Sequence, residues 1–306
     1  MRRKALTFVL AALGLVALPA CGGGGSGGDG GTIRSDGSST VGPLATAAAE
    51  RFQRENEGVR VTVGISGTGG GFERFCAGET DMSNASRPIK DEEKKVCADQ
   101  GIEYVELHVA NDALTVVTNP ENDWATCLTV AQLKKIWEPA SKVDSWDDVD
   151  PQFPDDKLTL FGPGTDSGTF DYFTDEVNGE EGASRSDYSS SEDDNVIVRG
   201  VSGEKGALGY FGFSYFEENQ DTLKALEVDG GDGCVGPSVE AAQDGTYKPL
   251  SRPLFIYAKT TSLERQEVRD FLSYMLDNAT EIAEAAQYVP LTEEQAQKSR
   301  DALEAA

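Results

Sequence analysis

Three short segments rich in serine, threonine and glycine each follow an expected strand and precede an expected helix. They are residues 36–40 (Asp-Gly-Ser-Ser-Thr), 66–71 (Ser-Gly-Thr-Gly-Gly-Gly) and 164–169 (Gly-Thr-Asp-Ser-Gly-Thr). The first turn of a helix leaves backbone N–H groups unpaired, and the helix dipole adds about half a positive charge there. Glycine allows a ligand to approach the backbone, and hydroxyls supply further donors. Three such helix starts, if they converge, would bind an anion without a lysine.

Helix capping is the simpler interpretation of any one of these segments, because Ser and Thr are favoured N-cap residues. The repetition of the pattern within one chain favours a binding site instead. Arg87 adds to that hypothesis, since it stands between a small polar run and Pro88. A guanidinium at the end of a strand can offer a fork of donors to a tetrahedral oxyanion. Considered alone, Arg87 would be a surface salt-bridge partner.

Nucleotide-binding and catalytic motifs do not fit this chain. The turn at 67–71 lacks the Lys-Ser/Thr of a P-loop, and Phe72 replaces the third glycine of the dinucleotide fingerprint. His108 is the only histidine and lies in an expected strand, and Ser167 is not in a G-x-S-x-G context. Residues 202–205 spell S-x-x-K, but the companion motifs of penicillin-recognising enzymes are absent. We therefore expect no enzyme and no cofactor.

The elements that must position these segments alternate between strand and helix. Apolar residues recur at every second position over 59–65, and further strand-like runs are 113–118, 158–161, 207–216 and 254–258. Helical spacing is found over 44–52, 72–76, 91–99, 170–177 and 263–275. Such alternation predicts a mostly parallel sheet in an α/β fold. The acid-rich stretches 141–156 and 180–195 are expected to be loops.

Length and charge limit the class of protein. The 306 residues are enough for about two domains of about 150 residues each. Asp and Glu number 53 against 27 Lys and Arg, which gives a net charge of −26. That balance argues against nucleic acid as a partner and against adsorption to an anionic membrane through basic residues. A small anion is still compatible, because local dipoles in a pocket can oppose the overall field.

The first residues have the pattern of an export signal. Residues 2–4 are cationic, and 6–18 form an apolar run of 13, which is shorter than the about 20 residues of a membrane span. We interpret 1–20 as a signal peptide. Its end, Leu-Pro-Ala-Cys, resembles a lipoprotein lipobox, which implies that Cys21 is lipidated; ordinary secretion is the alternative. Residues 21–31 would then be the lipidated cysteine and a flexible glycine-rich tether.

The other four cysteines are Cys76, Cys97, Cys127 and Cys234. An even number in an exported chain favours two disulfides, for which three connectivities exist. Proximity in the sequence suggests Cys76 with Cys97 and Cys127 with Cys234. A zinc site is the competing use, but no C-x2-C pair is present, so we expect no metal.

In combination these segments resemble the PstS family, the phosphate-binding lipoproteins of bacterial phosphate ABC importers. The resemblance spans nearly all of the mature chain and rests on 36–41, 67–72, 81–88, 162–170 and 191–195. The subgroup with Ala-Ser-Arg-Pro (85–88) and Gly-Pro-Gly-Thr-Asp-Ser-Gly-Thr (162–169) is the most similar. The resemblance implies an α/β, two-lobed type II periplasmic-binding-protein fold. Each lobe would be a mixed sheet flanked by helices, with the ligand cleft between the lobes. Residues 32–113 plus 254–306 would form lobe I and 114–253 lobe II.

The resemblance also implies which residues hold the phosphate. The expected ligands lie at the three helix starts: Ser39, Thr40 and Val41 at the first, Thr68 and Gly69 at the second, and Ser167, Gly168 and Thr169 at the third. Two charged residues, Arg87 and Asp166, complete the expected set of phosphate ligands.

Two departures from the family pattern concern charge. Members of the family carry an aspartate, which accepts the proton of bound phosphate, where Arg87 stands, and an arginine where Pro163 stands. The cation is thus expected to have moved to Arg87 in the other lobe. Sulfate has no proton at neutral pH, so a carboxylate acceptor would repel it while accepting from hydrogen phosphate. The candidate acceptors are Asp166, Asp194 and Asp36, in that order, with Asn195 as a further candidate ligand. If Asp166 is the acceptor, Asp166→Asn should reduce the preference for phosphate over sulfate.

The sequence therefore predicts a non-enzymatic, extracytoplasmic receptor. It would capture inorganic phosphate between its lobes, close about a hinge and deliver the ion to the membrane subunits of an ABC permease. We expect a monomer that contacts the membrane through its lipid anchor only and binds no nucleic acid. Another oxyanion (sulfate, molybdate or an organic phosphate) and a role in phosphate sensing are the alternatives. A phosphatase would need a metal cluster or an activated nucleophile, neither of which is evident.

Overall fold

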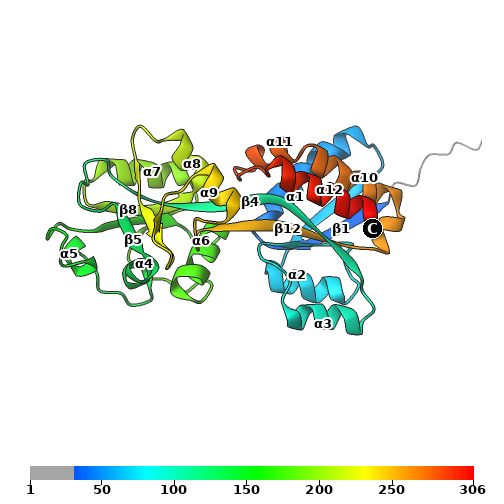
Figure 1. The fold of residues 1–306 in the computed structure, drawn as a ribbon, viewed down its shortest axis with the longest axis horizontal. Helices are drawn as coiled ribbons and strands as arrows, with labels where there is room; N and C mark the ends of the chain where they lie inside the picture. Colours follow the sequence, from blue (N-terminus) through cyan, green and yellow to red (C-terminus); the bar gives the residue numbers. More distant parts are fainter. Residues whose placement is uncertain (1–30) are drawn as a thin grey trace, which may run out of the picture.

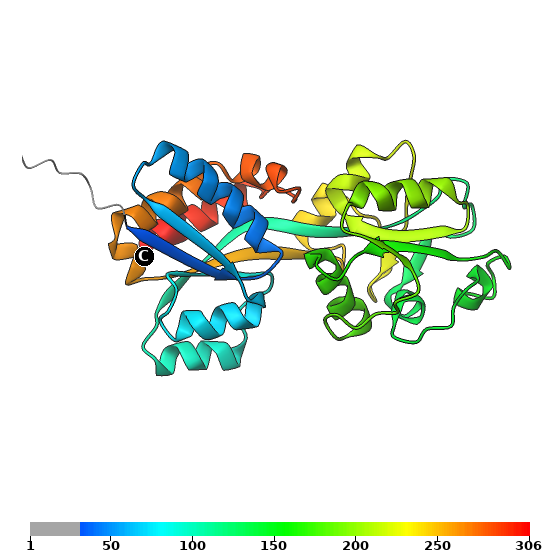
Figure 2. The same cartoon turned by 180° about the vertical axis from the view of Figure 1, so that it is seen from behind.

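The computed structural model describes residues 31–306. Figure 1 shows two bodies placed along the longest axis and joined by two long strands, β4 (Tyr104–Thr118) and β12 (Ser251–Lys259). Figure 2 shows the same two strands from behind. The predicted signal peptide, Cys21 and nearly all of the predicted tether lie outside the described residues. Among residues 31–306, no helix is both long and apolar enough to cross a membrane.

The first lobe contains both ends of the described chain and is built on a mixed sheet. The strand order is β2 (Arg60–Ile65), β1 (Thr32–Gly37), β3 (Met82–Ala85), β12 and β4. β1 is parallel to both of its neighbours, whereas β12 is antiparallel to β3 and β4. The carboxyl ends of β1, β2 and β3 therefore meet at one edge of the sheet. The segments that follow these three strands are thereby brought together.

Helices cover both faces of this sheet (Figure 1). On one face lie α1 (Val41–Glu55), α10 (Gln266–Asp277), α11 (Ala279–Ala285) and α12 (Glu293–Ala305), with a short 3-10 turn at Ser262–Glu264 before α10. On the other face lie α2 (Gly67–Cys76) and α3 (Asp91–Asp99). Each face has its own apolar core. The disulfide Cys76–Cys97 joins α2 to α3, which confirms the predicted pairing.

The second lobe has a sheet that shares β4 with the first. From β4 the order is β8 (Ala207–Gly212), β6 (Thr159–Pro163) and β7 (Ser189–Ser191), and β9 (Lys224–Ala225) also pairs with β4. A smaller sheet contains β5 (Cys127–Thr129), β10 (Glu227–Asp229) and β11 (Cys234–Val235). The disulfide Cys127–Cys234 joins β5 to β11 and confirms the second predicted pairing.

Short helices surround the sheets of the second lobe. They are α4 (Val130–Trp137), α5 (Trp146–Val149), α6 (Gly168–Phe173) with a π-helical turn at Thr174–Asn178, α7 (Asp194–Gly203), α8 (Phe213–Glu218) and α9 (Val239–Asp244). Aromatic side chains dominate the main core of this lobe. Trp137, Phe173 and Tyr210 are fully or almost fully buried against one another.

β4 changes its partner in the middle. It pairs with β12 as far as Ala113 and with β8 from Leu114 onward. This change supports the division into 32–113 plus 254–306 and 114–253 that we propose. The main sheet of each lobe is mixed, not mostly parallel, because β4 and β12 run antiparallel to each other and to the other strands they pair with, β3, β8 and β9.

Three predicted elements are wrong in part. The stretches 141–156 and 180–195, predicted to be loops, contain the short helix α5 and the strand β7. The apolar run 207–216 was expected to be one strand, but the strand ends at Gly212 and α8 begins at Phe213. A continuous apolar run has no period that separates a buried strand from a buried helix. The bend at Gly212 turns the chain away from the sheet beside the connection between the lobes.

Candidate anion-binding site

The three predicted helix starts meet at a single cavity of about 430 Å³ between the lobes. The first lobe contributes the starts of α1 and α2 and the side chain of Arg87. The second lobe contributes the start of α6 and a group of carboxylates. Arg252 of the connecting strand β12 also lines the cavity. Donors from both lobes therefore face the same space.

At the start of α1, one serine acts as the cap. Ser38 Oγ accepts hydrogen bonds from the backbone N–H groups of Thr40 (3.2 Å) and Val41 (3.3 Å). Capping, the simpler interpretation, therefore holds for these two amides. The hydroxyl of Thr40 is different: Thr40 Oγ1 accepts from Arg252 Nη2 at 2.8 Å. Since its oxygen is the acceptor in that bond, its own proton is available for a ligand.

The start of α2 leaves space for a ligand. A side chain built at Gly67 or Gly69 would meet no atom within 4 Å, and Gly67 has a φ of +75°, which favours glycine. Thr68 Oγ1 accepts from the backbone N–H of Ser86 (3.2 Å) and shares a hydrogen bond with its hydroxyl (3.0 Å). The first turn of α2 is thus held against the end of β3. Thr68 and Gly69 line the cavity, and the first N–H groups of a helix have no partner within the helix.

At the start of α6, glycine permits contact between the lobes. A Cβ at Gly168 would lie 3.0 Å from Thr40 Oγ1 and 3.3 Å from its backbone nitrogen. Ser167 caps the helix, since its Oγ accepts from the N–H of Thr169 at 3.2 Å. Ser167 and Thr169 are partly buried beside the cavity, and only Gly168 of the three lines it.

Arg252 is the cation at the centre of the connection. It forms a salt bridge with Asp112 Oδ2 of β4, with Nε and Nη2 each 3.2 Å away. Its guanidinium carbon lies 3.5 Å from the centre of the Tyr172 ring. Burial raises the pKa of Asp112, and Arg252 offsets part of that shift. Among residues 31–306, Nη1 of Arg252 has no hydrogen-bond partner, so it can donate to a ligand.

Arg87 also lines the cavity and is held by a carboxylate of α3. Its Nη1 and Nη2 donate to Glu93 at 2.8 and 2.7 Å, and Nη1 also donates to the carbonyl of Pro88. Burial would raise the pKa of Glu93, but hydrogen bonds from Arg87 and the backbone of Lys90 lower it overall. Within the described chain, the Nε edge of the guanidinium has no partner. One pair of N–H donors of Arg87 is therefore left for an oxyanion.

The second lobe supplies several carboxylates to the cavity lining, and Asp171 is the one that accepts a hydrogen bond from the first lobe. Asp171 Oδ2 lies 3.5 Å from Ser39 Oγ, which donates to it across the cleft. Burial and the nearby Glu181 raise the pKa of Asp171, opposed by Ser39 and Arg252. Burial, followed by Asp175, raises the pKa of Glu176. A ligand in this cavity thus meets both arginine side chains and carboxylate acceptors.

The candidate acceptors named from the sequence do not line this cavity. Asp166 is exposed in the loop before α6. Asp36 is buried beneath α2, where it accepts from Ser66 Oγ at 2.7 Å and pairs with Arg74. Asp194 and Asn195 lie at the start of α7, and burial, with Asp193 and Glu192, raises the pKa of Asp194 to about 6.

Among the residues that the sequence analysis missed are Arg252 and Asp171, which line the cavity, and Asp112, the salt-bridge partner of Arg252. A signal for Arg252 and Asp112 exists, because charged residues at 112 and 252 interrupt or border apolar strand-like runs. Nothing near Asp171 separates it from the other acidic residues of the second lobe.

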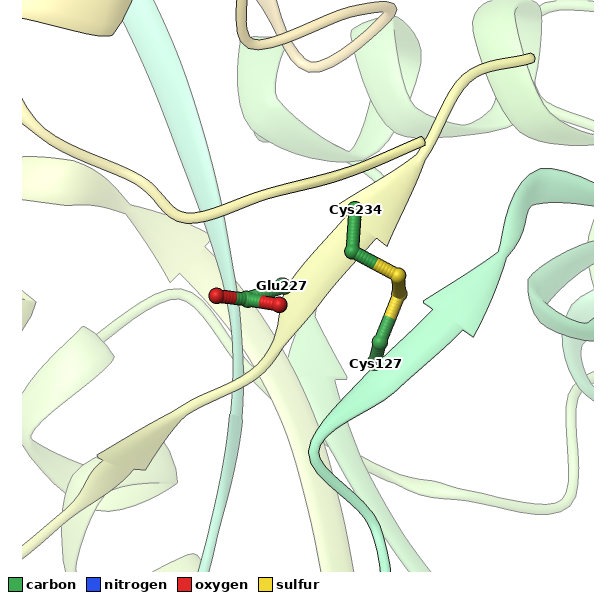
Figure 3. Close-up of side chains that lie close together, drawn as sticks. All are labelled: Cys127, Glu227 and Cys234. Carbon is green, nitrogen blue, oxygen red and sulfur yellow. A yellow bond between two sulfur atoms is a disulfide. The ribbon is translucent and has the colours of Figure 1, made fainter. Parts of the chain in front are cut away.

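One group in the described part of the chain has the composition of a metal site, and it lies outside this cavity. Figure 3 shows Cys127 and Cys234 joined as a disulfide, with Glu227 beside them. Metals bind the thiolate form of cysteine. Because both sulfurs are already in the disulfide, this group offers no thiolate ligand.

Comparisons with known proteins agree with this geometry. Residues 23–279 match the PBP superfamily domain. The chain is 49% identical over 266 residues to the protein SphX of Synechocystis, covering 86% of this chain and 79% of the relative. It is 41% identical over 295 residues to the phosphate-binding protein PstS of Staphylococcus saprophyticus, covering 94% and 91%. The crystal structure of a possible phosphate binding protein from Planctomyces limnophilus superposes with a TM-score of 0.87 at 46% identity, covering 90% of this chain and 98% of that one.

Proposed function

The chain belongs to the PBP superfamily and, within it, to the PstS-type phosphate-binding proteins, and we propose on that basis that its interlobe cavity captures inorganic phosphate. Members of this family are solute-binding proteins of ABC transporters and not enzymes. The observation that carries the proposal is the meeting of two helix starts of the first lobe, one of the second and two arginines at one cavity.

Phosphate would be held by a few charged donors and several neutral ones. Arg252 Nη1 and the Nε edge of Arg87 supply the charged donors. The amides at the start of α2, at Thr68 and Gly69, and the hydroxyl of Thr40 supply neutral donors from the first lobe. Gly168 supplies a backbone amide from the second. Charge-assisted hydrogen bonds are about twice as strong as neutral ones, so the arginines would dominate the binding energy.

The remaining helix-start residues named from the sequence stay candidates for weaker contacts. These are Ser39, Val41, Ser167 and Thr169. The N–H of Val41 and that of Thr169 are each directed at a serine oxygen at 3.2–3.3 Å. Such long bonds can be shared with a ligand oxygen.

Selectivity for phosphate over sulfate would come from Asp171. Hydrogen phosphate carries a proton that it can donate to a carboxylate, whereas sulfate has none. The carboxylate of Asp171 lies across the cleft from the donors of α1, where Ser39 Oγ reaches it at 3.5 Å. A sulfate held by the same donors would face this carboxylate without a proton between them, which costs binding energy through repulsion.

The ligand would link the two lobes, because its donors come from both. A ligand shifts a two-state equilibrium by its difference in affinity for the two states. Phosphate would therefore favour the arrangement in which the helix starts meet, and this arrangement would be the one presented to the permease. We propose that the receptor acts outside the cytoplasmic membrane as a monomer, anchored through a lipid on Cys21.

Titration calorimetry on residues 32–306 tests the proposal. The protein is first freed of ligand by partial unfolding and refolding, and phosphate and sulfate are titrated separately. One-to-one binding of phosphate, with much weaker binding of sulfate, is the expected result. A folded sample that gives no heat with phosphate would contradict the proposal.

A further inference from the structure

A loop that belongs to neither connecting strand also bridges the lobes. This loop, residues 286–292 between α11 and α12, is called the joint segment here. Its Val289 pairs with Asn111 of β4 through two backbone hydrogen bonds of 2.9 Å. The hydroxyl of Tyr288 donates to the carbonyl of Thr40 at 2.7 Å. The joint segment is thus tied to the connecting strand on one side and to the helix start at the cavity on the other.

The joint segment also contacts two helices of the second lobe. Ser214 Oγ of α8 donates to the carbonyl of Gln287 at 2.7 Å. Gln243 Nε2 of α9 donates to the carbonyl of Pro290 at 2.8 Å. In return, Gln295 Nε2 of α12 donates to the backbone carbonyl of Gln243 at 2.9 Å. Three hydrogen bonds therefore cross between the lobes around this loop.

An apolar contact lies at the centre of these hydrogen bonds. Val289, 3% exposed, packs with Phe213 of α8, Ala242 of α9 and Ala113 of β4. Gln287 has a φ of +61°, a conformation that is uncommon for a residue other than glycine. Such a conformation persists where the surroundings hold it in place. The joint segment is therefore a packed, fixed part of the interface between the lobes.

We propose that the joint segment stabilises the arrangement in which the two walls of the cavity meet, and so sets phosphate affinity from outside the site. This inference rests on the proposed function. Within residues 31–306, the chain passes between the lobes only through β4 and β12, as Figures 1 and 2 show. Their relative position therefore depends on non-covalent contacts. In the observed arrangement the starts of α1 and α6 are in contact, since a Cβ at Gly168 would lie 3.0 Å from Thr40 Oγ1.

The expected change in phosphate affinity follows from the fraction of molecules in which the two walls of the cavity meet. The apparent dissociation constant equals the intrinsic one divided by the fraction of molecules in which the site is assembled. Weakening the joint segment lowers that fraction and leaves the ligand contacts unchanged. Phosphate affinity should therefore fall although no residue of the cavity has been altered.

The test uses two joint variants, one altered in the joint segment and one altered in α9, which contacts it; each has a control variant of the same residue type away from the contact. Val289→Ala removes the apolar contact, and Val268→Ala removes an equally buried valine from α10, away from the joint. Gln243→Ala removes one interlobe hydrogen bond, and Gln297→Ala removes a glutamine of α12 that bonds Asp301 within its own helix. Calorimetry gives the dissociation constant, and small-angle X-ray scattering gives the spread of interlobe distances without phosphate.

We expect both joint variants to raise the dissociation constant for phosphate by about three- to tenfold and to broaden the scattering-derived distribution. The control variants should do neither, although Val268→Ala should lower the melting temperature. Folded joint variants with wild-type affinity and wild-type scattering would overturn the proposal. If the wild-type protein binds no phosphate, the proposed function fails. The scattering comparison of Val289→Ala with Val268→Ala then still decides whether the joint segment holds the lobes.

Discussion

Replacing Arg252 with glutamine is the most informative perturbation of the site. The substitution removes the guanidinium that donates to Thr40 at 2.8 Å and whose Nη1 is free for a ligand. A hydrogen bond to a charged group contributes about 1.5–3 kcal/mol, and about 1.4 kcal/mol corresponds to a tenfold change in affinity. We therefore expect Arg252→Gln to weaken phosphate binding by about 10- to 100-fold.

The same substitution affects stability for a separate reason. Asp112 is buried, with its side chain 7% exposed, and Arg252 is its salt-bridge partner. Removing one partner of a buried pair costs about 3–5 kcal/mol, because a charge is left without compensation. The double variant Asp112→Asn with Arg252→Gln removes that charge. It should recover much of the stability but none of the affinity.

Calorimetry with phosphate and thermal unfolding separate these two effects. Arg300→Gln serves as the control, since Arg300 pairs with Glu293 on α12 and lies away from the cavity. This control should bind phosphate as the wild type does. Arg252 does not bind phosphate if the affinity of Arg252→Gln for phosphate is within twofold of the wild-type affinity, or if the double variant recovers the full affinity.

Three further predictions concern selectivity, closure and stability. Asp171→Asn should lower the phosphate-over-sulfate ratio of affinities by about tenfold, because sulfate no longer faces a carboxylate; separate titrations of the two anions measure this ratio. Gly168→Ala should weaken phosphate binding without unfolding the protein, because the added Cβ would lie 3.0 Å from Thr40 Oγ1 at the start of α1. Calorimetry measures the phosphate affinity, and circular dichroism shows whether the variant is folded. Replacing Cys127 and Cys234 by serine opens a connection of 107 residues and should lower the free energy of unfolding by about 2–5 kcal/mol. Denaturant titration measures that loss, and phosphate affinity of the folded variant should stay the same.

Each of these predictions has a control or a contradicting outcome. Asp166→Asn is the control for Asp171→Asn and should leave the phosphate-over-sulfate ratio of affinities unchanged, because Asp166 is exposed outside the cavity. If that ratio changes with Asp166→Asn and not with Asp171→Asn, Asp166 is the proton acceptor. Gly203→Ala is the control for Gly168→Ala, since an added Cβ there meets no atom within 4 Å. Equal affinities for these two alanine variants would show that the lobes need no contact at Gly168. A disulfide variant as stable as the wild type would show that the second bridge adds nothing.

Features that depend on local sequence could be predicted. The helix starts at Val41, Gly67 and Gly168 follow from the small polar residues that precede them, and the structure confirms all three. Both disulfide pairings followed from proximity along the chain and are confirmed. The helix starts depend only on neighbouring residues, and the four cysteines allow only three ways of pairing.

Features that depend on strand register could not be predicted. Arg252 and Asp112 are 140 residues apart and meet because β12 and β4 pair antiparallel with these two residues opposite each other. The sequence assigned the cation to Arg87 alone, because that residue stands within a recognisable motif. The place of Asp171 at the cavity could not be predicted, because it depends on how the second lobe faces the first. Convergence between lobes is a property of the assembled fold and leaves no local pattern.

The crystal structure of residues 32–306 with phosphate tests the central claim most directly. We expect one tetrahedral anion in the interlobe cavity, within hydrogen-bond distance of Arg252 Nη1 and of the backbone N–H of Gly69, with one oxygen facing Asp171. An anion bound elsewhere on the protein, or a cavity that stays empty at saturating phosphate, would contradict it.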